Sequence, residues 1–164
     1  MQIRLKKGRD GPDSLACVRE DGTSTWKRLQ RSLAFHDLAH YAVESELAIA
    51  DGFFGLVESG WTFDDLAAAE ERARIPPDAV WVEFLVNLFL TEATSGEVYD
   101  EDAFHESIVQ SAAKVGAAVP RRLDVEEIAS IRGRILALVG RWRSLAPGET
   151  LELPFATPRA ETRS

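Results

Sequence analysis

The sequence is poor in cysteine. Its 164 residues contain a single one, Cys17. Neither an internal disulfide framework nor a zinc site built from several thiolates can therefore form within the chain. A lone thiol suits a reducing compartment, so we expect a cytoplasmic protein. The length predicts one domain that is large enough to bury a hydrophobic core.

Positive charge is also in deficit. There are 19 Lys and Arg against 27 Asp and Glu, which gives a formal net charge of −8. Nucleic acids and anionic membranes both favour a basic protein surface, so we expect neither as a partner.

Long hydrophobic runs are missing as well. The longest, Ala79 to Leu90, is interrupted by Glu83 and Asn87 and is too short to span a bilayer. The first ten residues are charged and lack the apolar segment of a secretory signal, so we expect no export.

The first thirty residues have the two-residue periodicity of strands. Apolar and polar residues alternate around residues 3–5, 15–17 and 23–29, and Asp21-Gly22 is typical of a hairpin turn. Near the other end, residues 150–155 alternate in the same way and contain Pro154, which favours an edge position. This last strand could join the N-terminal sheet.

From residue 33 the apolar spacing becomes helical. Ser32 is the expected N-cap of the first helix, and Thr62 and Asp124 each precede an acidic residue at the spacing of a capping box. The predicted segments cover residues 33–50, 53–59 (a short helix or a turn), 62–76, 77–94, about 100–119 and 124–145.

These patterns predict an α+β fold. We expect a small antiparallel N-terminal sheet, which the C-terminal strand could join, packed on about five α-helices. Residues 1–156 would form this single domain, and residues 157–164 would be a polar C-terminal tail.

Two histidines form the most specific chemical pattern. In His36-Asp37-Leu38-Ala39-His40 they stand at i and i+4, so on a helix they are rotated by about 40° and separated by about 6 Å along the axis. Zinc, nickel or iron can bind two such nitrogens. Glu44 follows at the next step, about 12 Å along the axis from His36. We therefore expect Glu44 to orient His40 from behind or to pair with it alone.

The same residues resemble two known patterns. One is the H-E-x-x-H motif of zincin metalloproteases, in which Asp37 would occupy the position of the glutamate that acts as general base. The other is a group of uncharacterised bacterial proteins with an H-D-L-x-H-x-x-V-E helix, which the segment from His36 to Glu44 resembles. The first resemblance implies metal-assisted hydrolysis, and the second implies no particular activity.

A solvent-exposed polar face would explain the same spacing without a metal. At about 100° per residue, the apolar side chains centre on one side of the helix, and both histidines, Asp37 and Glu44 lie nearly opposite. However, Leu33 and Leu47 fall within this polar stripe, and the stripe contains no Lys or Arg. Both interpretations stay open from the sequence.

The third histidine, His105, shares a helical face with Ile108 and Ala112 and is predicted to point inward. It could complete a three-histidine metal site. A hydrogen-bonded core histidine would give the same pattern.

Glu83 interrupts an apolar helix. A buried carboxylate needs a partner, which could be a histidine or a metal on the first helix, or Arg132 or Arg134. An exposed Glu83 would need none. Glu92, near the end of the same helix, is expected to be solvated.

Two functions follow from these patterns. The first is a divalent-metal-binding protein or metal-dependent hydrolase. His36 and His40 would bind zinc or a similar ion with His105 or Glu83, and Asp37 or Glu44 would act as base on a small ester, amide or phosphoester. The alternative is a non-enzymatic homo-oligomeric interaction protein without metal, which would associate through a sheet edge or through the aromatic and glycine residues of segment 53–61.

Overall fold

Four strands form one antiparallel sheet in the order β3–β2–β1–β4. The bounds are β1 Gln2–Lys6, β2 Asp13–Val18, β3 Ser24–Leu29 and β4 Thr150–Pro154. The computed structural model describes residues 1–30, 33–68 and 75–157. The predicted hairpin between β2 and β3 is confirmed: Gly22 has φ +84°, and Asp21 Oδ1 accepts hydrogen bonds from the backbone nitrogen and hydroxyl of Thr23.

The C-terminal strand does join the N-terminal sheet. Leu153 of β4 lies opposite Ile3 of β1, and Leu151 lies opposite Leu5. All four leucine and isoleucine side chains are buried, because every second residue of each strand faces the helices. Pro154, which has no N–H to donate, stands at the end of an edge strand, as predicted.

Six helices follow the third strand along the chain within the described residues. Their bounds are α1 Leu33–Glu46, α2 Phe53–Glu58, α3 Phe63–Ala67, α4 Pro77–Ser95, α5 Glu101–Val115 and α6 Val125–Ser144. The predicted capping boxes at Thr62 and Asp124 are both present. The α+β class is confirmed, with six helices in place of the expected five or so.

The first helix ends at Glu46, earlier than the predicted Ala50. Ala48 adopts a left-handed conformation with φ +52°, and the backbone nitrogen of Ile49 donates to the carbonyl of Glu44, which closes the last turn. The predicted N-cap Ser32 and residues 69–74 of the predicted 62–76 segment lie outside the described residues. Thr157, assigned to the tail, donates to Glu58 through its backbone nitrogen and its hydroxyl.

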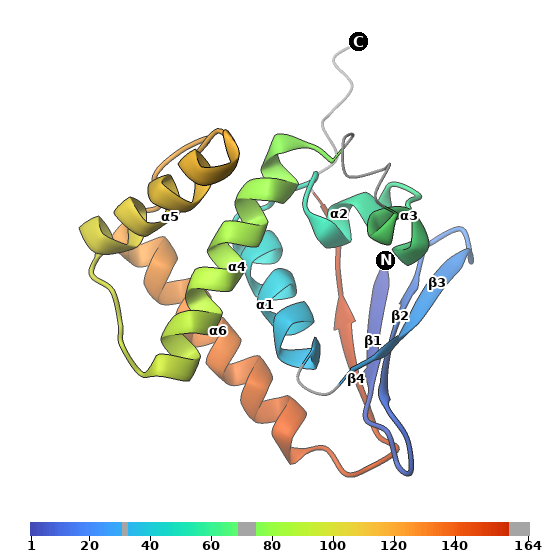
Figure 1. The fold of residues 1–164 in the computed structure, drawn as a ribbon. Helices are drawn as coiled ribbons and strands as arrows, with labels where there is room; N and C mark the ends of the chain where they lie inside the picture. The colour runs from blue at the N-terminus through green and yellow to red at the C-terminus, as the bar shows by residue number, and fades with distance from the viewer. Residues whose placement is uncertain (31–32, 69–74, 158–164) are drawn as a thin grey trace.

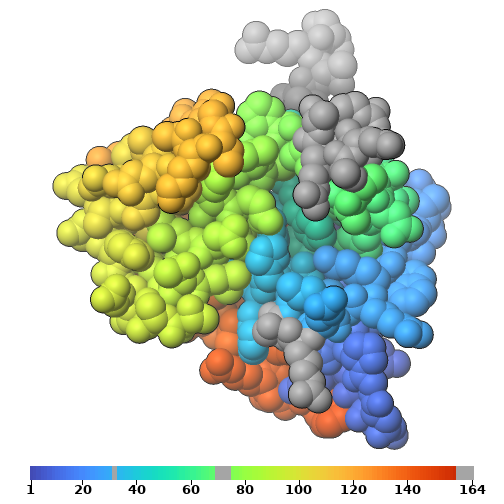
Figure 2. Space-filling model, viewed as in Figure 1, coloured from blue at the N-terminus to red at the C-terminus, as the bar shows by residue number. Residues whose placement is uncertain are grey.

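Helix α1 lies between the sheet and α4, and it also packs against α2 and α6 (Figure 1). Every residue from Asp37 to Glu44 is buried, so this helix is covered all round rather than on one face. On the face drawn in Figure 2, α1 (light blue) is visible between α4 and the sheet. None of the helices in the described ranges has the length and hydrophobicity needed to cross a membrane.

Candidate metal centre

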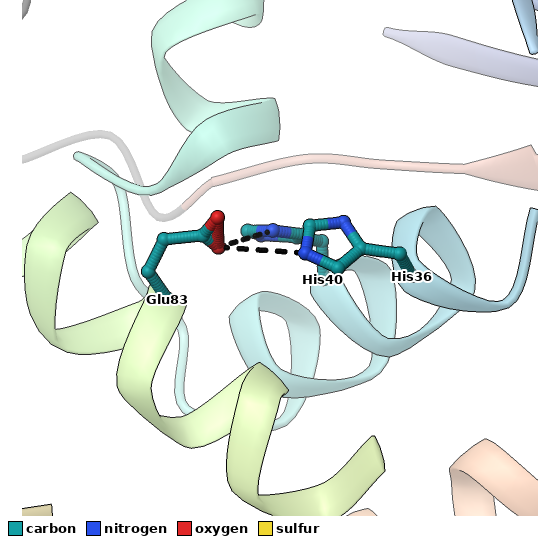
Figure 3. Close-up of side chains that lie close together, drawn as sticks. All are labelled: His36, His40 and Glu83. Atoms are coloured by element: carbon teal, nitrogen blue, oxygen red, sulfur yellow. Dashed lines mark ion pairs between the residues drawn. The ribbon is translucent and has the colours of Figure 1, made fainter. Parts of the chain in front are cut away.

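His36 and His40 of α1 point toward Glu83 of α4 (Figure 3). Glu83 Oε2 lies 3.0 Å from Nε2 of His40 and 3.7 Å from Nε2 of His36. The two imidazole centroids are 4.7 Å apart, as expected for i and i+4 side chains on one helix face. The packing of α1 on α4 thus gathers two nitrogens and one carboxylate around one point.

These three side chains fit a divalent ion. Their ligand atoms all lie within 4.8 Å of one another. Zinc binds nitrogen and oxygen at about 2.0–2.2 Å, which places tetrahedral ligands about 3.5 Å apart, so only small side-chain shifts are needed. Two histidines and one carboxylate also leave coordination positions open for water or substrate.

A second carboxylate pairs with the ring nitrogen of His40 that faces away from Glu83. Nδ1 of His40 lies 3.2 Å from Oε1 of Glu44, so its Nε2 is left to face Glu83. A carboxylate on the remote ring nitrogen is the usual support of a metal-binding histidine, because it fixes the tautomer and the ring orientation. The sequence spacing predicted this pairing of Glu44 with His40.

Glu44 is itself fixed by α2. Its Oε2 accepts hydrogen bonds from the backbone nitrogens of Phe54 at 2.9 Å and Gly55 at 3.1 Å, which are otherwise free at the start of the helix. A Cβ on the preceding Gly52 would lie 2.5 Å from the Glu44 Cδ. Glycine at this position therefore allows the carboxylate to reach the helix end.

Asp37 and Lys27 form a second charged pair beside the histidines. Lys27 Nζ, from β3, lies 3.4 Å from Asp37 Oδ1 and also lies over the rings of Phe53 and Phe63, at 4.8 and 5.0 Å. Oδ2 of Asp37 is buried and has no hydrogen-bond partner among the described residues. A buried carboxylate oxygen without a partner is costly, and this cost favours the neutral form of the carboxyl.

The electrostatics of the site favour charge on His40. Burial alone would lower the pKa of the His40 imidazole, but the hydrogen bonds and negative charges of Glu44 and Glu83 outweigh it and raise the pKa to about 9. Partial burial raises the pKa of the Glu83 carboxyl, yet the hydrogen bond and charge of His40 bring it below its usual range. Without metal, His40 is therefore a cation between two carboxylates.

The pKa values of His36 and Asp37, the two neighbouring groups, shift in the directions that favour their neutral forms. Desolvation, together with the charge of His40, lowers the pKa of the His36 imidazole. Desolvation also raises the pKa of the Asp37 carboxyl, against the opposing effect of Lys27. His36 thus presents the neutral imidazole that a metal ion requires.

The cluster opens into a pocket of about 510 Å³. Lys27, His36, Asp37, His40 and Glu83 contribute its polar wall. The remaining wall is mainly apolar and comes from Phe53, Leu56, Leu66, Ile75, Ala79, Val80, Phe84, Asn87 and Val115. The molecular surface is hollowed between α4 and α3 (Figure 2). This volume lies within the range of pockets that bind small molecules.

The solvent-exposed interpretation of the first helix is wrong. Asp37, His40 and Glu44 are all buried, because α2, α4 and the sheet cover the polar side of α1 as well as its apolar side. The structure does not place Glu44 at the pocket wall, where a general base would meet a substrate. Its Oε1 pairs with His40 and its Oε2 accepts from α2, which matches the expected orienting role and not the role of a base.

The structure does not bring His105 to the cluster. α5 packs against α4, and His105 lines a separate small pocket with Trp81, Phe104 and Ile108. Among the described residues, the group that could hold a metal contains Glu83 and not His105. Of the two candidates for the third ligand, the fold places only Glu83 beside the other histidines.

Glu92 is the other correction. It was expected to be solvated, but it is 5% exposed and pairs with Arg132 of α6 through Nε and Nη2. Its Oε1 also accepts from the backbone nitrogen of Tyr99. Arg132 therefore forms its ion pair with Glu92, and Arg134 forms one with Glu46. Neither arginine is the partner of Glu83.

One residue of the pocket, Lys27, was not predicted. Its signal lies in the alternation of β3, where Thr25 and Leu29 are buried and Lys27 shares their side of the strand. An inward-facing lysine requires a negative partner, and Asp37 supplies it.

Comparison of the chain with protein-family models, with curated proteins and with solved structures finds no match. The resemblances to the zincin motif and to the bacterial H-D-L-x-H-x-x-V-E proteins therefore stay predictions.

Proposed function

We propose that His36, His40 and Glu83 bind one divalent metal ion, zinc or a similar one, and that the protein is a metal-dependent hydrolase. The observation that carries this proposal is the support of His40. One ring nitrogen faces Glu83 and His36 at the pocket wall, and the other is held by the fully buried Glu44. Catalytic metal sites have the same arrangement: a carboxylate orients the ligating histidine, and the metal keeps a coordination position free for water or substrate.

Each residue has a distinct role in this proposal. A bound ion would activate water and polarise a carbonyl or phosphoryl oxygen. Asp37 lines the same pocket, and its carboxylate would accept the proton of the attacking water. Lys27 would hold Asp37 in place. The apolar wall around Phe53 and Phe84 would contact the apolar part of a small ester, amide or phosphoester substrate. The reaction would take place in the cytoplasm.

Metal content is the test. Protein purified without a histidine tag should take up one equivalent of zinc, measured by elemental analysis and titration calorimetry. Glu83→Gln and His36→Ala should lose this uptake, because each removes one of three ligands at a partly exposed position. His105→Gln is the matched control and should retain it. Absence of stoichiometric uptake, or equal uptake in all variants, would overturn the proposal.

Self-association is the second candidate, supported by a different surface. Val98 and Leu136 are 69% and 67% exposed and line one groove together with Phe89 and Ile135. Large exposed apolar side chains that share a groove are typical of an interface. Light scattering should then give a multiple of the 18.1 kDa chain mass, and Leu136→Glu should restore the monomer.

A further inference from the structure

The outer face of the sheet carries a second candidate site, on the side away from α1 and α4 (Figure 1). A groove of about 590 Å³ crosses this face at the end where β1 leads into β2. It is lined by Lys6, Lys7, Gly8, Arg9, Pro12, Ser14, Trp26, Arg28 and Gly148. No acidic residue is part of this lining, although the chain as a whole has a net charge of −8.

Three cations of the groove have no carboxylate partner within the described residues: Lys6, Arg9 and Arg28. The neighbouring Lys7 is different, because its Nζ donates to three carbonyls at the end of α6. Arginines elsewhere are mostly neutralised, such as Arg4 by Glu152. The unpaired positive charge of the groove is therefore concentrated on side chains that are free to bind an anion.

The strand register places two of these cations, Lys6 and Arg28, on either side of Ser14. Ser14 of β2 lies opposite Arg28 of β3 on one side and opposite Lys6 of β1 on the other. Neighbouring strands are about 4.8 Å apart, so the Cα atoms of Arg28 and Lys6 are separated by about 10 Å, with the small Ser14 side chain between them. A group of phosphate size fits between two such cations.

Trp26 adds an aromatic surface to the same groove. It lies on the same face of β3 as Arg28, opposite Ala16, and it is 65% exposed. Residues that alternate to the other face of β3, Thr25 and Leu29, are buried. An indole on an uncovered sheet face beside free cations is a stacking surface for a base, as in proteins that bind nucleotides in single strands.

Electrostatics limit the size of the ligand. A long polyanion would meet the acidic remainder of the molecule, since the net charge is −8. A small anion that is confined to the groove would meet its cations first, although Asp10 and Asp13 adjoin the groove beside Arg9. The volume of about 590 Å³ is that of a small-molecule site.

We propose that this groove binds a small aromatic anion of the nucleoside phosphate class, with the base against Trp26 and the phosphates against Arg28, Lys6 and Arg9. This site is separate from the pocket of His36 and His40, because the two lie on opposite faces of the sheet and share no lining residue.

The test uses the full chain with EDTA present, so that the candidate metal centre does not contribute. ATP, AMP, adenosine and inorganic triphosphate are titrated by calorimetry. ATP should bind more tightly than AMP, and both should bind more tightly than adenosine, because each added phosphate meets another cation. Trp26→Ala should weaken ATP binding at least about fivefold and leave triphosphate binding unchanged, since it removes only the stacking surface.

Arg28→Gln should weaken both ATP and triphosphate by about tenfold. Its matched control is Arg141→Gln, which removes the same charge from α6 outside the groove and should change neither affinity. Glu83→Gln should bind ATP as the wild type does. The proposal is overturned if ATP does not bind, if Trp26→Ala has no effect, or if Arg141→Gln matches Arg28→Gln. Affinity that grows with the length of an oligonucleotide would also overturn it, in favour of a nucleic acid.

Discussion

Helix α4 contributes two glutamates to two polar clusters of opposite character. Glu92 is 5% exposed and is held by Arg132 and the backbone nitrogen of Tyr99, so its charge is fully partnered inside the protein. The side chain of Glu83 is 48% exposed and meets two imidazoles at the edge of a pocket. The first cluster is closed in the sense that both oxygens of Glu92 are paired within the protein, although Glu92 and Arg132 also line the groove of Val98 and Leu136, and the second cluster is open.

The chemistry of the partners explains the difference. A guanidinium keeps its proton and offers planar donors that match a carboxylate, which favours a permanent bond. An imidazole can lose its proton and bind a metal ion through the same nitrogen. The Glu92 cluster therefore suits a structural role, and the Glu83 cluster suits exchange of a proton, a metal or a substrate.

Removing a partner from the closed cluster should have the largest effect. Arg132→Ala leaves the Glu92 carboxylate buried without a cation and should reduce the free energy of unfolding by about 3–5 kcal/mol. Urea denaturation followed by circular dichroism measures this. Glu83→Gln, on the open side of the same helix, should cost less, about 1–2 kcal/mol, because Glu44 still pairs with His40. Equal losses for both variants would contradict the distinction between the clusters.

The open cluster should make the stability of the metal-free protein depend on pH. The folded state raises the pKa of His40 from 6.5 to about 9, so it binds this proton more tightly than the unfolded chain does. The resulting stabilisation is complete below pH 6.5 and is lost as the pH rises toward 9. We expect a decrease of up to about 3 kcal/mol over this range.

Denaturation in EDTA at several pH values measures this dependence. In His40→Gln the slope between pH 6.5 and pH 9 should disappear. Arg4→Gln, which removes an exposed ion pair with Glu152, should keep it. A wild-type protein whose stability is constant over the range would show that His40 is not charged between Glu44 and Glu83.

The smallest effect concerns the support of the metal centre. Glu44→Gln keeps the size of the side chain and the acceptor for Phe54 and Gly55 but removes the charge behind His40. Zinc affinity should fall by about 10- to 100-fold, as for other residues that orient a metal-binding histidine. Competition with a chromogenic chelator measures it, and unchanged affinity would remove Glu44 from the site.

Local patterns predicted much of this structure. The alternation of Ile3 and Leu5, the capping boxes and the i, i+4 spacing of His36 and His40 act between residues that are close in sequence. The pairing of His40 with Glu44 follows from the same helical geometry. These features need no knowledge of the packing.

The errors concern contacts between distant segments. A helical wheel cannot show that α1 is covered on several sides, so Asp37 was assigned to a possible solvent face when β3 in fact brings Lys27 to it. His105 was expected to point inward and is half-buried, but α5 packs against α4, and His105 lines a pocket separate from that of the α1 histidines. Glu92 finds its partner on α6, where no sequence spacing relates it to Arg132.

The pairing of β4 with β1 has a consequence for biosynthesis. The sheet is complete only when β4, residues 150–154, lies beside β1, residues 2–6. Until β4 has been translated, β1 is therefore an open edge of the sheet. Contacts of such large sequence separation slow folding, and open edges favour aggregation. We therefore expect the sheet to close only after residues 150–154 have been translated, with a yield that depends on how well the edge of β1 is shielded by chaperones until then.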